Sequence, residues 1–398
     1  MPLYWWRLAA SLFCLAALAP GSSAALPQTA DPRAAALERL LTAPDIDAEW
    51  FDPAFLAKVP RDQVAAIIKD LRNRYGALRR VAPAPGGGFT VTLERADIPA
   101  RVTLTADGRI AGLFFQPAVP LMGTLDDHVR TIAALPGRTS VLVTTNGRTR
   151  AAHEPDRPLA VGSAFKLAVL RAAAERVEAG ALAWDRVVAL EPHWRSLPSG
   201  ILQQWPHGTP VTVATLANLM ISISDNTATD ALIALIGREA VEAQAPHSRP
   251  FLTTREASVL KADAKLRKAW DAADTAGRRA LLAGPVATRP LPSDEAVTGV
   301  TLSVEWPFAA QDLCQLLEAT KDLQPFRINP GPADPAHWRT IAFKGGSETG
   351  VLNLSTFVVA EDGTRHCVVA TWNDDKALDH DRLFTPYRAL LRALSDAR

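Results

Sequence analysis

Residues 161–170 read VGSAFKLAVL, and this short stretch indicates both a buried helix and a reactive side chain. Ser163 and Lys166 are three positions apart, so on a helix they lie on one face, one turn from each other. The remaining side chains are apolar on nearly all sides, which is typical of a buried helix. Burial and the positive N-terminal end of a helix both disfavour a charged amine, so we expect the pKa of Lys166 to be lowered. A neutral amine can take the proton of the serine hydroxyl and make it a nucleophile.

The Ser-x-x-Lys pattern is weak when it stands alone. A serine that caps a helix, followed by a lysine whose amine reaches solvent, gives the same letters. The chain itself contains a second copy, Ser258 to Lys261, in polar helical surroundings. Further motifs are therefore needed before Ser163 can be taken as a nucleophile.

The second motif lies in residues 220–237, MISISDNTATDALIALIG. Ser224, Asp225 and Asn226 stand between two apolar helical runs, where capping residues are also expected. If the motif is catalytic, Ser224 relays a proton to the substrate nitrogen that leaves when the bond to the carbonyl carbon breaks. Asn226 then holds Lys166 and the amide side chain of the substrate.

The third motif lies in residues 342–355, AFKGGSETGVLNLS. Glycines weaken a strand unless another backbone must come close, and a substrate lying along the strand is such a case. Lys344 would then attract a substrate carboxylate beside Gly346, and Ser347 would donate a hydrogen bond to it. The backbone N–H groups of Ser163 and Ser347 would form an oxyanion hole. A lysine in a bulge or turn is the structural alternative.

Taken in order, Ser-x-x-Lys, Ser-Asp-Asn and Lys-x-Gly resemble the three motifs of class A β-lactamases and penicillin-binding proteins. Only the Ser163 copy precedes Ser-Asp-Asn, so the order selects it over Ser258. The resemblance covers about residues 122–396. It implies an α/β sandwich, with an antiparallel sheet flanked by helices, and an acyl-enzyme on Ser163 that opens β-lactam rings without a cofactor. It also implies catalytic roles for Lys166, Ser224 and Asn226.

Two departures from the family pattern stand out. Gly345 occupies the position that usually holds threonine or serine in the third motif. Class A enzymes also carry Glu-x-x-x-Asn after Ser-Asp-Asn, and that glutamate activates the water that releases the acyl group. Glu256 lies at a suitable distance and is our candidate deacylation base, although position 260 is leucine rather than asparagine.

Other activities of the same site remain open at this stage. An esterase or a DD-peptidase could use Ser163 in the same way, and a protein without a deacylation base would bind β-lactams and release them slowly. A Ser-His-Asp hydrolase is disfavoured because the chain has no Gly-x-Ser-x-Gly motif.

The N-terminus indicates export. Residues 1–24 contain a basic residue, a short apolar stretch and small residues at the end, as in a cleaved signal peptide. The apolar stretch is too short to span a bilayer, so we expect a periplasmic or secreted protein without a stable membrane anchor. Cys14 follows the bulky Phe13, which argues against lipidation.

The 398 residues are too many for one average domain. Residues 27–119 show two helical patterns and then short alternating runs, which predict a small α+β domain similar to cystatin-like or NTF2-like modules. Residues 122–398 form the predicted hydrolase domain, in which strands at 139–145, 350–360 and 364–372 form one sheet and a helix at 383–394 ends the chain.

Composition limits the partners. The net charge of +1 argues against a nucleic-acid-binding protein. The family resemblance implies a small-molecule substrate, a β-lactam or an ester, and we expect the protein to be a monomer. No metal-binding motif is found. Cys314 and Cys367 remain after the signal peptide, and the sequence leaves open whether they form a disulfide or stay free.

Overall fold

The computed structural model describes residues 31–84 and 87–396. The signal peptide predicted for residues 1–24 lies outside the described residues and stays a prediction. No helix within the described ranges is both long and apolar enough to cross a bilayer.

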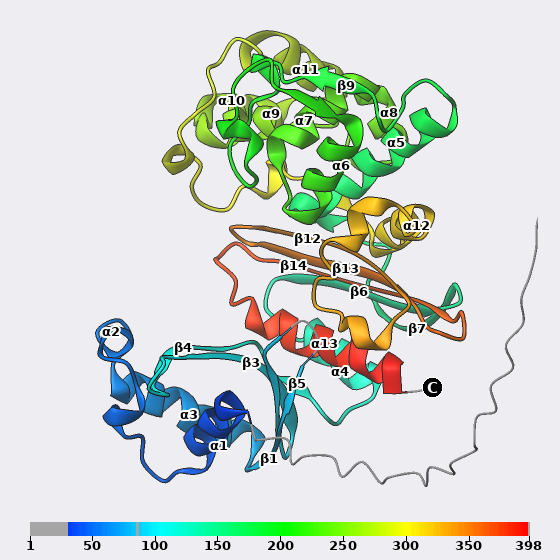
Figure 1. Ribbon diagram of the computed structural model, residues 1–398. Coiled ribbons are helices and arrows are strands. Elements are labelled where there is room, and N and C mark those ends of the chain that lie inside the picture. The colour runs from blue at the N-terminus through cyan, green and yellow to red at the C-terminus, as the bar shows by residue number, and fades with distance from the viewer. Residues whose placement is uncertain (1–30, 85–86, 397–398) are drawn as a thin grey trace, which may run out of the picture.

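Residues 32–120 form helices packed on an antiparallel sheet (Figure 1). The helices are α1 (Pro32–Thr42), α2 (Pro53–Leu56) and α3 (Arg61–Tyr75). The strands are β1 (Leu78–Pro83), β2 (Phe89–Leu93), β3 (Ala96–Leu104), β4 (Ile110–Phe115) and β5 (Val119–Pro120). Every second residue of β2 is buried, and its Phe89, Val91 and Leu93 share one apolar core with Leu37 and Leu40 of α1. This is the α+β architecture expected from the sequence.

The second sheet has five antiparallel strands in the order β12-β13-β14-β6-β7. Their bounds are β12 (Thr340–Glu348), β13 (Val351–Val359), β14 (Arg365–Asn373), β6 (Arg138–Thr145) and β7 (Arg148–His153). All residues of β13 are buried, as is typical of a strand covered on both faces. The strands come from both ends of residues 122–398, as predicted, and β12 is left as an edge.

Helices cover both faces of this sheet (Figure 1). On one face lie α4 (Leu125–Ala133) and α13 (Asp381–Asp396), and on the other lies α12 (Ala310–Thr320). The predicted sandwich of an antiparallel sheet between helices is thus confirmed.

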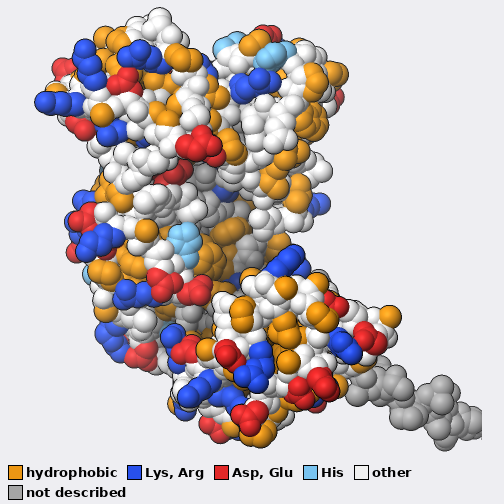
Figure 2. Space-filling model, turned by 90° about the vertical axis from the view of Figure 1, so that its left-hand side faces the viewer, with side chains coloured by type: hydrophobic (Ala, Val, Ile, Leu, Met, Phe, Trp, Pro, Cys, Tyr) orange, Lys and Arg blue, Asp and Glu red, His pale blue; other side chains and the backbone are white. Residues whose placement is uncertain are grey.

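A helical part lies beyond α12 and surrounds α5 (Lys166–Glu178) (Figure 1). Its other helices are α6 (Val213–Ser222), α7 (Asn226–Ile236), α8 (Arg238–Ala243), α9 (Thr254–Ala262), α10 (Ala264–Ala272) and α11 (Thr275–Leu281). Two short strand pairs complete it, β8 (Leu159–Ala160) with β11 (Pro307–Phe308) and β9 (Val187–Ala189) with β10 (Pro210–Thr212). The face turned to the viewer in Figure 2 is hollowed between this helical part and the sheet below it.

Helix α13 also contacts the N-terminal part of the chain. Arg388 donates a hydrogen bond to Gln116 at 2.8 Å, and Arg392 forms an ion pair with Asp97 of β3. In Figure 1 the N-terminal sheet accordingly lies against α13, on the side of that helix away from the second sheet.

Cys314 of α12 and Cys367 of β14 form a disulfide, with Cα atoms 5.9 Å apart. The sequence left this pairing open. The bond links a covering helix to a central strand of the sheet.

Candidate active site

The three motifs meet at one cleft. A cavity of about 560 Å³ lies where the turn before α5, the α6–α7 junction and edge strand β12 come together, in the hollowed region between the helical part and the sheet (Figure 2). Its lining includes six of the residues singled out from the sequence: Ser163, Ser224, Asn226, Lys344, Gly346 and Ser347. Residues that are far apart in the chain thus face one space.

Ser163 lies in a 3₁₀ turn, Gly162–Phe165, which runs directly into α5. Gly346 packs so closely on this turn that a Cβ atom there would lie 2.4 Å from the Ser163 nitrogen. Gly162 has φ +50°, and a Cβ atom there would lie 3.0 Å from the Ser347 nitrogen. The close approach of the two backbones brings the Ser163 and Ser347 amides together, as an oxyanion hole requires.

Lys166 is completely buried and makes three hydrogen bonds to residues that line the cleft. Its Nζ donates to Ser224 O at 2.6 Å, to Ser224 Oγ at 3.0 Å and to Asn226 Oδ1 at 2.6 Å. Burial and the nearby charge of Lys344 hold the pKa of Lys166 well below its ordinary value. The lowered pKa favours the uncharged amine, which is the form that can accept a proton.

The Ser-Asp-Asn segment both caps a helix and builds the cleft. Asp225 is the N-cap of α7, and its Oδ1 accepts a hydrogen bond from Ala228 N at 2.8 Å. Its Oδ2 accepts bonds from the backbone of Ile201 and Leu202, which fixes the loop beside the cleft. Ser224 has φ +60°, a left-handed conformation uncommon outside glycine. Capping and site geometry are therefore properties of the same residues.

Lys344 of β12 also forms a hydrogen bond with Ser224. Its Nζ donates to Ser224 Oγ at 3.2 Å and to Gly345 O at 2.6 Å. Burial lowers the pKa of Lys344 to about 7. The hydroxyl of Ser224 thus lies between two amines that gain or lose protons easily, which is the arrangement a proton relay needs.

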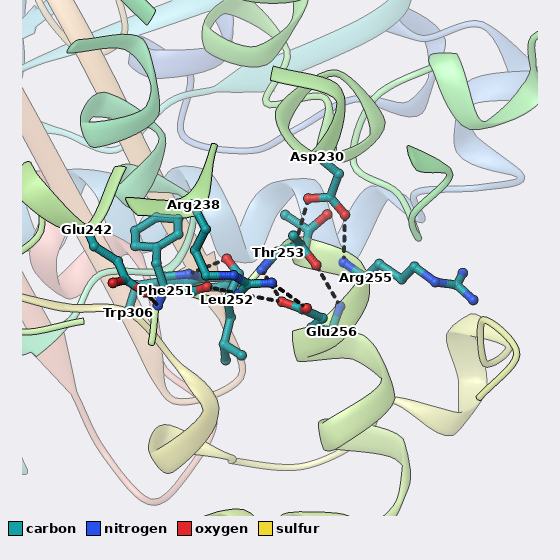
Figure 3. A network of polar contacts seen from close by, with 10 residues as sticks. Asp230, Arg238, Glu242, Phe251, Leu252, Thr253, Arg255, Glu256 and Trp306 are labelled. Atoms are coloured by element: carbon teal, nitrogen blue, oxygen red, sulfur yellow. Dashed lines mark hydrogen bonds and ion pairs between the residues drawn. The ribbon is translucent and has the colours of Figure 1, made fainter. Parts of the chain in front are cut away.

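Glu256 has other partners (Figure 3). Its carboxylate accepts hydrogen bonds from Arg238 at 2.7 and 3.0 Å and from Thr253 N at 2.8 Å, and it forms a capping box at the start of α9. Glu256 does not line the cleft. These contacts argue against the expected role of Glu256 as the deacylation base. The sequence pattern Thr253-x-x-Glu256 is itself typical of a capping box.

A buried carboxylate beside Glu256 supports the same helix. Asp230 of α7 accepts hydrogen bonds from Thr254 N at 2.7 Å and Arg255 N at 2.9 Å (Figure 3). Burial raises the pKa of Asp230 to about 7 although these bonds oppose the rise. Its oxygens are directed to the N-terminus of α9 rather than to the cleft.

The second Ser-x-x-Lys copy has a structural arrangement of its own. Ser258 Oγ donates to Thr254 O, one turn back in α9. Lys261 forms ion pairs with Glu305 and, at 3.5 Å, with Glu348. Glu348 lines the cleft and was not singled out from the sequence. The sequence could have pointed to Glu348, because it lies two positions after Gly346 and four after Lys344. Residues at this spacing share one face of a strand.

Among residues 31–84 and 87–396, no group of three or more His, Cys, Asp or Glu side chains is arranged to hold a metal ion.

Solved structures with similar chains include a β-lactamase from Sphaerobacter thermophilus, which is 23% identical, covers 69% of this chain and 95% of its own, and has a TM-score of 0.44. PBP-A is 18% identical, with 69% and 94% coverage and a TM-score of 0.47. An ancestral class A β-lactamase is 18% identical, with 69% and 100% coverage and a TM-score of 0.48. No curated protein matches the chain.

A family model gives a more direct assignment. Residues 124–250, which include Ser163, Lys166 and the Ser-Asp-Asn segment, match the model of the Beta-lactamase enzyme family. The match covers these residues of the chain, and the sheet between helices and the cleft in which the motifs meet agree with a β-lactamase-like serine hydrolase fold.

Proposed function

We propose that this protein is an exported β-lactamase that opens the β-lactam ring through an acyl-enzyme on Ser163. The observation that carries the proposal is the buried pair of lysines, Lys166 and Lys344, both bonded to the hydroxyl of Ser224 next to the nucleophile turn. Burial keeps these amines close to deprotonation, so protons can be accepted and returned within the cleft.

The acylation step uses these groups in sequence. Lys166 takes the proton of the Ser163 hydroxyl, and Oγ adds to the lactam carbonyl carbon. The carbonyl oxygen, now negative, accepts hydrogen bonds from the Ser163 and Ser347 amides. The C–N bond then breaks, and Ser224 passes the proton held by Lys166 to the leaving nitrogen. Lys344 and Ser347 hold the carboxylate of the substrate.

Export is part of the proposal. Residues 1–24 are proposed to be removed as a signal peptide, leaving a periplasmic or secreted enzyme. The disulfide between Cys314 and Cys367 supports this location, because such bonds persist in oxidising compartments.

Two alternatives have specific support. Glu256, the expected base, is held in an ion pair with Arg238. This favours a β-lactam-binding protein that releases the acyl group slowly. Gly345 lacks the hydroxyl that the third motif usually offers near the substrate carboxylate, which favours an ester without that carboxylate.

Turnover of three substrates tests the proposal: a chromogenic cephalosporin, a p-nitrophenyl ester and a D-Ala-D-Ala peptide. We expect the highest kcat/KM for the cephalosporin and no turnover by Ser163→Ala. A preference for the ester or the peptide would assign the same site to an esterase or a DD-peptidase. Turnover that survives in Ser163→Ala would contradict the mechanism.

A further inference from the structure

We propose that Glu348 is the general base that activates water to release the acyl group from Ser163. The inference rests on the proposed function and names the residue for its second half-reaction. It answers the question left by Glu256, whose carboxylate is held by Arg238 and by the start of α9.

Strand geometry directs Glu348 toward the nucleophile. Successive side chains of a strand point to opposite faces, so Lys344, Gly346 and Glu348 share one face of β12. That face is turned toward Ser224 and the Ser163 turn, because Lys344 reaches Ser224 and Gly346 packs on the Ser163 nitrogen. Glu348 follows Gly346 by two residues, about 7 Å further along the strand. The side chain of Glu348 therefore leaves the strand near the Ser163 turn, on the same face of the sheet as this turn.

Glu348 also has the access to solvent that a water-activating base needs. Among the described residues that line the cleft, it is the one carboxylate. Its side chain is 45% exposed, whereas that of Glu256 is 16% exposed and engaged by Arg238. Water in the cleft can thus reach Glu348.

A buried ion cluster holds Glu348 in place. Lys261 of α9 lies 3.5 Å from Glu348 Oε2, is only 6% exposed, and also forms an ion pair with Glu305. Glu305 immediately precedes Trp306, whose carbonyl accepts a hydrogen bond from Val161 N at 3.1 Å. The cluster is thereby tied to the segment that leads into Ser163.

The electrostatics of the site agree with this placement. Burial is the main reason for the low pKa of Lys166, but the charge of Glu348 acts in the opposite direction, as do those of Asp225 and Asp230. Glu348 therefore lies within electrostatic range of the buried amine beside the nucleophile.

Release of the acyl group from Ser163 uses one water molecule and the Glu348 carboxylate. A water oxygen adds to the carbonyl carbon of the ester on Ser163 while the Glu348 carboxylate takes one of its protons. The Ser163 and Ser347 amides donate hydrogen bonds to the oxyanion. The bond between the carbonyl carbon and Ser163 Oγ then breaks, Oγ receives the proton held by Glu348, and the product leaves as a carboxylic acid.

Glu348→Gln tests this role, with Glu256→Gln as the matched control. For Glu348→Gln in stopped flow with a chromogenic cephalosporin, we expect a burst of acylation at nearly the wild-type rate. Steady turnover should then be lower by about 10²–10⁴-fold, the usual contribution of a general base. Intact-protein mass spectrometry should show the acyl-enzyme accumulating in Glu348→Gln, whereas wild type and Glu256→Gln return to the free mass.

A second variant separates base catalysis from packing. Formate should restore part of the turnover of Glu348→Ala, because it can supply the missing carboxylate, and a purely structural contact with Lys261 would not respond. Wild-type deacylation in Glu348→Gln would overturn the inference and leave the proposed function standing. A wild-type protein that is never acylated would remove the proposed function, and the inference with it.

Discussion

Replacing Lys344 by methionine should make the protein more stable while it weakens the active site. Lys344 is 4% exposed, and no acidic side chain among the described residues forms an ion pair with it, so burial lowers its pKa. Methionine has a similar length and no charge to bury. The variant therefore removes a cost that the folded protein bears for the sake of the site.

The size of the effect follows from the pKa of Lys344, which burial lowers from 10.5 to about 7. Below pH 7 the folded and unfolded states both carry the proton, so the folded state bears the whole cost, on the order of 5 kcal/mol at about 1.4 kcal/mol per pH unit. From pH 7 to 10.5 only the unfolded state stays protonated, and the cost falls to zero. The two hydrogen bonds lost with the amine offset about 2 kcal/mol.

We therefore expect Lys344→Met to raise the free energy of unfolding by about 3 kcal/mol at pH 6 and by nearly nothing at pH 9. Urea unfolding at both pH values measures this difference. A variant that is less stable than wild type at pH 6, or a difference that does not change with pH, would show that the buried charge of Lys344 does not destabilise the folded protein.

Lys261 offers the matched control because it is equally buried but paired. Burial would lower the pKa of Lys261, but the charges of Glu305 and Glu348 outweigh burial and raise it. Lys261→Met leaves Glu305 buried without its partner. At pH 9 this variant should lose about 3–5 kcal/mol of stability, the usual cost of breaking a buried ion pair from one side.

Three further predictions concern the cleft and the sheet. Gly346→Ala should lower kcat/KM by at least about 10²-fold, the cost of a lost oxyanion donor. The reason is that the added Cβ would lie 2.4 Å from the Ser163 nitrogen. Near-normal kinetics would show that this close approach is not required. Lys344→Ala should raise KM for a carboxylate-bearing cephalosporin more than for a p-nitrophenyl ester, and equal changes for both would count against carboxylate binding. Replacing Cys314 and Cys367 by alanine opens a loop with a sequence separation of 53 and should cost about 3–4 kcal/mol in urea unfolding, and unchanged stability would contradict this estimate.

Much of the cleft could be predicted because its parts are local. Ser163 and Lys166 are one helical turn apart, and the alternation of β12 places Lys344 and Gly346 on one face, so each motif defines its own geometry. The order of the three motifs then selected Ser163 over Ser258 as the nucleophile, which no single motif could do. The structure brings them to one cavity, as the resemblance implied.

The groups that depend on long-range packing could not be predicted in this way. Whether Glu256 or Glu348 faces the cleft depends on how α9 lies against β12, which no local spacing reports. Lys261 belongs to the second Ser-x-x-Lys copy, which is not catalytic in this interpretation. Its role as the ion-pair partner of Glu305 and Glu348 is seen only in the folded structure. Likewise, the disulfide needed the packing of α12 on β14 before the two cysteines could be paired.

The role of Ser163 as the nucleophile can be tested by locating the site at which a penicillin modifies the protein covalently. Protein mixed with benzylpenicillin should be quenched in acid after increasing times, digested, and its peptides mapped by mass spectrometry. We expect a transient mass increase equal to one intact penicillin, located on Ser163 and absent from Ser163→Ala. An adduct on another residue, or penicillin turnover with no adduct at any time in either protein, would contradict it.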